Sequence, residues 1–64
     1  MTGAEIIKIL KVHGWLALRQ SGSHVRLGNG TLRTTVPVHG KADVKPGTLA
    51  SIERQTGLKF RQER

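Results

Sequence analysis

The sequence has no cysteine and no tyrosine, and only one tryptophan and one phenylalanine occur among its 64 residues. Without cysteine the chain cannot form disulfides, use a thiol nucleophile or bind a metal through thiolates. With so few aromatic side chains the core must be a thin aliphatic layer, and this length is near the lower limit for folding alone. We therefore expect one small domain of marginal stability over residues 1–64.

Acidic residues are also scarce, because four Asp and Glu stand against eleven Lys and Arg, which gives a formal net charge of +7. This balance favours a polyanionic partner, and nucleic acid is the first candidate. No apolar run approaches the ~20 residues of a membrane-spanning helix. The N-terminal aliphatic stretch is interrupted by Lys8 and Lys11, unlike a signal peptide. We expect a soluble, cytoplasmic protein with no membrane partner.

The N-terminal residues have the pattern of a helix. Thr2 and Glu5 have the spacing of a capping box, and the aliphatic residues that follow repeat with a helical period. The pattern predicts a helix over about 3–13 that ends at Gly14. His13 lies at this end, where a cation is favourable to the helix dipole, so we expect it to have a structural rather than a catalytic role.

A second helix is predicted near the C-terminus. It should begin at about Pro46, because proline is favoured in the first helical turn, and it should end at Gly57. Leu58 and Phe60 would then fold back onto the helix as its hydrophobic contact. The charged residues 61–64 are expected to form a frayed tail.

Three strands are predicted between the helices, over about 15–20, 23–27 and 32–36. Ser21-Gly22 and Asn29-Gly30 have the composition of two-residue hairpin turns, in which glycine supplies a positive φ. Such short turns make neighbouring strands antiparallel. The predicted fold class is therefore α+β, a single small domain in the order α-β-β-β-α with a three-stranded antiparallel sheet.

The first predicted turn defines which apolar side chains face the core. With Ser21-Gly22 at the tip, Leu18 would lie opposite Val25, and Leu16 would lie opposite Leu27. Side chains alternate between the faces of a strand, so both apolar pairs would lie on the same face. We expect this face to pack on the core.

The opposite face of the predicted sheet is basic. It would hold Arg19 directly across from His24, Arg26 across from Arg33, and Thr35 beside them. Two arginines that face each other repel, which suggests an anion between them. The plain alternative is the solvated face of a half-buried sheet, but such a face would be expected to mix in acidic residues.

Several kinds of catalysis are poorly supported. The three histidines, His13, His24 and His39, are far apart in the sequence and Asp43 is the only Asp, so we predict no metal site and no cofactor. A Ser-His-acid hydrolase is also disfavoured. Ser23 adjoins His24 but points to the opposite face of the strand, and no acid is placed to orient the imidazole.

Metal-free RNA cleavage needs fewer protein groups, because the 2′-hydroxyl of the substrate is the nucleophile. A histidine can move the protons near pH 7, and His24 is the candidate general acid or base. Arg19, Arg26 and the amides around Gly22 could stabilise the phosphorane charge. His39 could act as a helper only if its loop folds toward the second strand.

Further phosphate contacts are predicted around this site. Lys45 lies at the start of the second helix, where free amides and the helix dipole also favour an anion. The predicted RNA- and phosphate-binding residues are Arg19, Ser21, Gly22, Ser23, Arg26, Arg33, Lys41 and Lys45. If these residues only bind phosphates, the chain is a non-catalytic RNA-binding module. A purely structural interaction domain would show no salt-dependent affinity for RNA.

Several motifs in register resemble the HicA family of bacterial toxins over essentially the whole chain. They are Gly14-Trp15, Arg19-Gln20-Ser21-Gly22-Ser23-His24, Thr35-Val36-Pro37-Val38-His39, Pro46-Gly47-Thr48-Leu49 with Ile52, and Gln55-Thr56-Gly57-Leu58. The resemblance implies a fold like a double-stranded-RNA-binding domain, with both helices on one face of the sheet. It also implies a bacterial mRNA interferase in which the histidine of the Gly-Ser-His motif, here His24, is catalytic. The implied partners are mRNA and a cognate HicB-like antitoxin that covers the His24 face.

Overall fold

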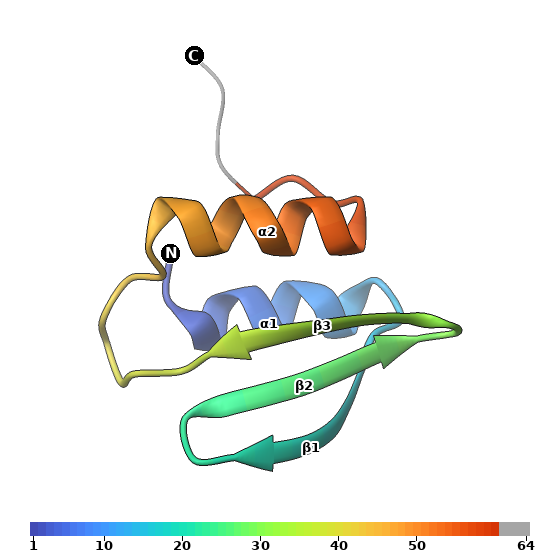
Figure 1. Cartoon of the computed structure of the whole chain (residues 1–64), viewed down its shortest axis with the longest axis horizontal. Helices are drawn as coiled ribbons and strands as arrows, with labels where there is room; N and C mark the ends of the chain where they lie inside the picture. The colour runs from blue at the N-terminus through green and yellow to red at the C-terminus, as the bar shows by residue number, and fades with distance from the viewer. Residues whose placement is uncertain (61–64) are drawn as a thin grey trace.

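The computed structural model describes residues 1–60, so the tail predicted at 61–64 lies outside the described residues. Within residues 1–60 the chain forms two helices and three strands (Figure 1). In chain order they are α1 (Gly3–Val12), β1 (Leu16–Ser21), β2 (His24–Asn29), β3 (Leu32–Pro37) and α2 (Pro46–Thr56). The strands form an antiparallel sheet in the order β1-β2-β3. This arrangement confirms the predicted α+β fold and its α-β-β-β-α order.

The first helix begins and ends as its sequence predicts. The Glu5 amide donates a hydrogen bond to Thr2 Oγ1 at 3.2 Å, and the Thr2 amide donates to Glu5 Oε1 at 2.8 Å, so the capping box is formed. Gly14 follows the helix with φ of 89°. The chain then turns back, and Trp15 is buried with its amide donating to the Leu10 carbonyl at 3.0 Å.

The second helix also matches its prediction. Pro46 is its first residue, and Gly57 caps its C-terminus in the left-handed conformation with φ of 77°. The chain folds back after this cap, so that Phe60 is buried and its amide donates to Glu53 Oε2 at 2.9 Å. In the described part of the chain, neither helix is long and apolar enough to cross a membrane.

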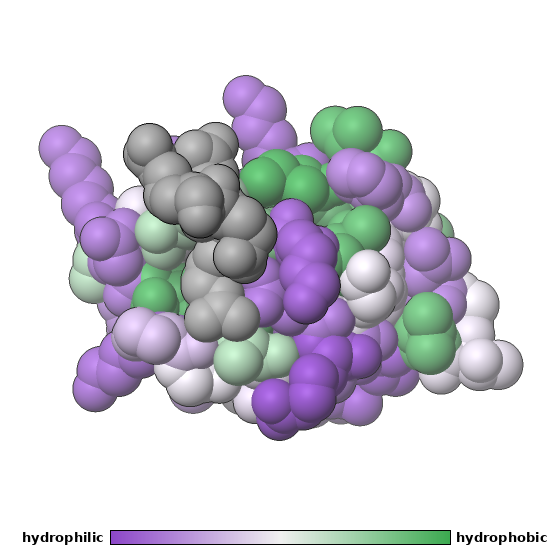
Figure 2. All heavy atoms as spheres, turned by 90° about the horizontal axis from the view of Figure 1, so that it is seen from above, coloured by the Kyte–Doolittle hydropathy of each residue, from purple (hydrophilic) through white to green (hydrophobic). Residues whose placement is uncertain are grey.

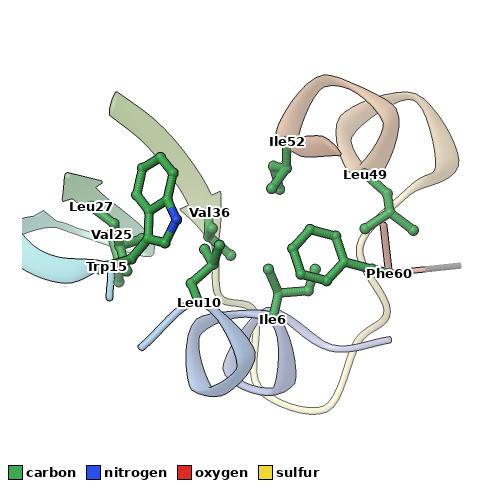
Figure 3. Close-up of a cluster of buried hydrophobic side chains, with 9 residues drawn as sticks. All are labelled: Ile6, Leu10, Trp15, Val25, Leu27, Val36, Leu49, Ile52 and Phe60. Atoms are coloured by element: carbon green, nitrogen blue, oxygen red, sulfur yellow. The ribbon is translucent and has the colours of Figure 1, made fainter. Parts of the chain in front are cut away.

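The core lies between the helices and one face of the sheet. Figure 3 shows side chains of α1 and α2 pointing toward those of the strands. The buried cluster consists of Ile6, Leu10, Trp15, Val25, Leu27, Val36, Leu49, Ile52 and Phe60. Figure 2, seen from the α2 side, shows mainly hydrophilic residues, with smaller hydrophobic groups between them. Because the buried residues of both helices pack against the same side of the strands, both helices cover one face of the sheet, and its other face is open.

The hairpin turns lie one residue later than predicted. Ser21 pairs with His24, so the first tip is Gly22-Ser23, and Asn29 pairs with Leu32, so the second tip is Gly30-Thr31. Gly22 and Gly30 have φ of 60° and 62°, and each occupies the first loop position rather than the second. The predicted tips Ser21-Gly22 and Asn29-Gly30 are wrong because the positive φ is required at the first position of these turns.

The shifted turns change the cross-strand partners. The predicted pairs of Arg19 with His24 and of Arg26 with Arg33 are wrong. The observed pairs are Arg19 with Arg26, Ser21 with His24, Arg26 with Thr35, and Gly28 with Arg33. Each partner is displaced by two positions, so these residues still share the open face of the sheet.

A register shift in β1 overturns one further prediction. The ladder with β2 slips by one residue around Leu18, in the manner of a β-bulge. Leu16 is 67% exposed and Leu18 is 50% exposed, so neither faces the core as predicted. Their expected partners Val25 and Leu27 are buried, as predicted.

Candidate active site

His24 begins β2 and lies exposed on the open face of the sheet, directly across from Ser21. A hollow of about 350 Å³ surrounds it and is lined also by Arg19, Arg26 and Thr35. Arg26 is held over this hollow, because its Nη1 donates to Thr35 Oγ1 at 3.1 Å. Ser21 also lines the hollow, so the three strands together bring a histidine, two arginines and two hydroxyls to one place.

Arg19 and Arg26 are direct cross-strand neighbours beside His24. Like charges at directly opposed positions destabilise a sheet. None of the described side chains that line this hollow is acidic. The sequence predicted repulsion between Arg26 and Arg33. In the structure the opposed arginines are Arg19 and Arg26, which lie beside His24. A bound anion would relieve their repulsion.

The loop after β3 brings His39 to His24. Their ring centroids are 6.3 Å apart and the rings are nearly perpendicular, at 85°. Part of the reason is a backbone hydrogen bond, in which the Val38 amide donates to the Ser23 carbonyl at 2.6 Å. The turn of the first hairpin thus holds the start of the loop. The condition set for His39 as a helper, that its loop folds toward the second strand, is met.

The far end of the same loop is tied to the N-terminal segment. Thr2 and Asp43 form an antiparallel bridge, and the Val44 amide donates to the Met1 carbonyl at 2.8 Å. The Met1 ammonium lies 3.2 Å from Asp43 Oδ1. Because these contacts flank the loop that carries His39, the position of His39 depends on residues that are remote in the sequence.

A second hollow of about 460 Å³ extends from His24 toward α2. It is lined by His24, Thr35, Pro37, His39, Ala42, Asp43, Val44, Lys45 and Thr48. His24 and Thr35 line both hollows, which therefore form one continuous surface. Figure 1 shows why, since the β1–β2 turn, the loop after β3 and the start of α2 lie at the same end of the molecule.

The start of α2 is open to a negatively charged group. Lys45 is its N-cap and makes no capping hydrogen bond with its side chain, and the first turn has no acidic residue. The first helical hydrogen bond runs from the Leu49 amide to the Lys45 carbonyl at 2.9 Å. The amides of Gly47 and Thr48 precede it and have no partner within the helix. Such a helix end favours phosphate.

A family model described as the HicA toxin of bacterial toxin–antitoxin systems matches residues 3–58. The match spans both helices and all three described strands. The chain belongs to the HicA toxin family. It is therefore the toxin of a toxin–antitoxin system, and an antitoxin is its implied partner. Comparison with curated proteins and with solved structures found no match.

Not all of the other predicted phosphate-binding residues of this HicA-family chain line the hollows around His24. Ser21 lines the smaller hollow, whereas Ser23 and Gly22 line neither. The Gly22 carbonyl accepts a hydrogen bond from Gln20 Nε2 at 3.0 Å. Lys41 is exposed in the loop after β3 but lines neither hollow.

Arg33 lies outside this surface as well. Its Nη1 donates to the carbonyls of Gly30 at 2.8 Å and of Leu32 at 2.7 Å, so the side chain folds over the β2–β3 turn. Its cross-strand partner is Gly28, at the opposite end of β2 from His24. The structure therefore separates Arg33 from the two arginines beside the histidine.

Sequence reasoning did not single out Thr48 and Asp43, which line the larger hollow of the HicA-family chain. Thr48 could have been predicted from its place in the first turn of the second helix, two residues after Pro46. No local signal indicated Asp43. Within residues 1–60, no group of three His, Asp or Glu side chains is placed to hold a metal ion.

His13 is separate from the site. It caps the C-terminus of α1, and its Nδ1 lies 2.9 Å from the Ile9 carbonyl oxygen. It lines neither of the two hollows that contain His24. His13 is therefore an exposed histidine outside the site, and its substitution can serve as a control for substitutions of His24 and His39.

Proposed function

We propose that this toxin is a metal-independent endoribonuclease that cleaves mRNA, with His24 as a general acid or base. The observation that carries the proposal is the pairing of His24 with His39, whose ring centroids are 6.3 Å apart. Both imidazoles line the same hollow and can reach one phosphodiester. Arg19 and Arg26 beside them add positive charge that complements the negatively charged phosphodiester.

The reaction requires two proton transfers. The 2′-hydroxyl of a ribose attacks the adjacent phosphorus as its proton passes to a general base. The bond from phosphorus to the 5′-oxygen then breaks, and a general acid gives that oxygen a proton. The products are a 2′,3′-cyclic phosphate and a 5′-hydroxyl. Two histidines can serve as base and acid, since imidazole accepts and donates protons near neutral pH.

Positive groups around the histidines would stabilise the charge on the phosphorane. Arg19 and Arg26 face this point from the sheet, and Lys45 faces it from the start of α2. Preorganised donors that are aimed at a developing charge are worth roughly 3–4 kcal/mol each in other enzymes. Arg26 is preorganised in this sense by its hydrogen bond to Thr35.

The same surface would bind the RNA backbone. We assign phosphate contacts to Arg19, Arg26, Lys41 and Lys45, with Ser21 and the Gly22-Ser23 turn at the edge of the site. Contacts to phosphate carry no sequence information, so this surface alone would accept many single-stranded or flexible sequences. The absence of a 2′-hydroxyl would protect DNA from cleavage.

The proposed antitoxin is a HicB-like protein that covers His24 and the arginines beside it. The family implies an antitoxin, and an acidic surface on that partner would complement the net charge of +7. In the inhibited complex, amide hydrogen exchange should slow over 19–26. Unchanged exchange in this segment would place the antitoxin elsewhere.

The decisive experiment is to incubate the purified toxin with mRNA in EDTA and to determine the new ends. We expect 5′-hydroxyl and 2′,3′-cyclic phosphate ends, which disappear with His24→Ala and persist with His13→Ala. The matched control is informative because both histidines are exposed. RNA that is bound with salt-dependent affinity but not cut would identify a non-catalytic RNA-binding module instead.

A further inference from the structure

The end of the open sheet face away from His24 has an unusual surface, formed by Leu18, Gly28 and Arg33. A Cβ atom at Gly28 would lie 2.8 Å from Leu18 Cδ1 and 2.9 Å from Arg33 Nη1. Both side chains therefore lie over the glycine, which is buried beneath them. Because Gly28 follows Arg26 by two residues in β2, this surface lies on the same face as Arg26.

The guanidinium of Arg33 is held in place rather than free. Both carbonyls that bind it belong to the β2–β3 turn, and both bonds are made by Nη1, at 2.8 and 2.7 Å. A nitrogen with two hydrogens that makes two such bonds has no hydrogen left for a phosphate. Nε and Nη2 keep three N–H donors, but the two bonds fix the orientation of the guanidinium, so its planar face has a defined position beside Gly28. Arginine planes stack on nucleobases in RNA complexes.

The neighbouring surface is apolar. Leu18 is 50% exposed and Leu16, the other cross-strand neighbour of Gly28, is 67% exposed. A nucleobase matches this combination, because its flat face is apolar and also attracts a cation. An aliphatic side chain from a protein would satisfy the leucines but would leave the guanidinium without a π partner.

The distance to the proposed active site is suitable for one RNA strand. Gly28 lies four residues from His24 along β2, which is roughly 13 Å at the rise of a β-strand. Arg26 lies between them on the same face and would contact the backbone on the way. The surface around Gly28 is thus continuous with the proposed RNA site.

We propose that Leu18, Gly28 and Arg33 form a platform that binds one nucleobase of the RNA strand whose phosphates lie at His24. This inference rests on the proposed function and adds a base-binding position to it. It assigns Arg33 to a base rather than to a phosphate. A position of this kind would give the toxin a preference for a base at a set distance from the cut.

The test measures binding of 2′-O-methyl RNA oligonucleotides, which cannot be cut by 2′-hydroxyl attack, using fluorescence anisotropy. One nucleotide at a time is replaced by an abasic residue, which keeps the phosphate charge. At one position relative to the bound strand, base loss should weaken binding to the unmodified toxin by about 5-fold or more, as expected for a stacked base. Leu18→Ala and Arg33→Lys should each weaken binding of intact RNA similarly and remove the effect of the abasic residue.

Two controls separate stacking from charge and from general surface changes. Arg33→Lys keeps the positive charge but loses the plane. Leu32→Ala removes a leucine that is also 50% exposed, but Leu32 pairs with Asn29, which places it on the other face of the sheet. We expect Leu32→Ala to bind RNA like the unmodified toxin. Urea unfolding of each variant would verify that it folds.

Four results would overturn the inference. If Arg33→Lys binds normally while Arg33→Ala does not, Arg33 is a phosphate contact. If Leu18→Ala and Leu32→Ala both bind RNA normally, the platform does not touch RNA, although the proposed function stands. If Leu18→Ala and Arg33→Lys impair only antitoxin binding, the surface serves a protein partner. If the unmodified toxin binds no RNA, the inference and the proposed function fail together.

Discussion

The pairing of His24 with His39 leads to a quantitative prediction about three variants, His24→Ala, His39→Ala and the double substitution. Both side chains are exposed, so their removal should change the free energy of unfolding by less than about 1 kcal/mol. Changes in rate can then be attributed to chemistry rather than to unfolding. The rings are 6.3 Å apart and line one hollow, so the proposed roles concern the same phosphodiester.

The magnitude follows from the number of proton transfers. Loss of one general acid or base costs about 10²–10⁴ in rate, which corresponds to about 3–5 kcal/mol of transition-state stabilisation. If the two histidines acted independently, the double variant would lose about the product of the single effects. If they act as a unit on one phosphodiester, removing the second should cost little more, as in other catalytic groups. We expect this second outcome.

The assay is single-turnover cleavage of a labelled RNA at saturating toxin, so that binding does not limit the rate. His13→Ala is the control, because it removes an exposed histidine that makes its hydrogen bond at the end of α1. The reasoning would be refuted if His39→Ala cut RNA at the rate of the unmodified toxin, or if the double variant lost the full product of the single effects.

The fold and the charge of the site give three further predictions. Val25→Ala should cost about 2 kcal/mol because Val25 is 9% exposed in the core, whereas Leu18→Ala should cost less than about 1 kcal/mol; equal urea midpoints would contradict the observed bulge. Gly3→Ala should lower the urea midpoint, corresponding to roughly 1–3 kcal/mol, because its Cβ would collide with the Pro37 carbonyl; an unchanged midpoint would count against this packing. Lys45→Ala should reduce the slope of log affinity against log salt by about 0.7, the value for one phosphate on a single strand, and an unaltered slope would remove Lys45 from the RNA site.

The helices were predictable from the sequence because their signals are local. The capping box of Thr2 with Glu5 and the glycine after α2 each act within a few residues, and both are formed as expected. The position of His39 was not predictable in this way. It depends on a hydrogen bond from Val38 to Ser23, and on a bridge from Asp43 to a segment about forty residues earlier. Contacts of this kind leave no periodic pattern in the sequence.

The sheet shows which register errors matter for a site and which do not. Both turns lie one residue later than predicted, which displaces the cross-strand partners by two positions, except beyond the bulge in β1. Side chains alternate with a period of two, so such a displacement exchanges neighbours but keeps each residue on its face. His24 and Arg26 therefore share the open face with Arg19, as predicted, although the pair that faces each other is a different one.

The slip around Leu18 has the opposite effect, because it displaces the ladder by a single residue. Beyond this point, the residues of β1 exchange faces. Leu16 and Leu18 leave the predicted core and lie exposed on the face that carries the arginines, beside Gly28. The bulge thus moves apolar surface out of a small core, where burial would have stabilised the fold, onto the surface proposed to bind RNA. If the platform binds a base, this displacement has a functional reason, and a variant that restored the regular ladder would gain stability while losing affinity for RNA.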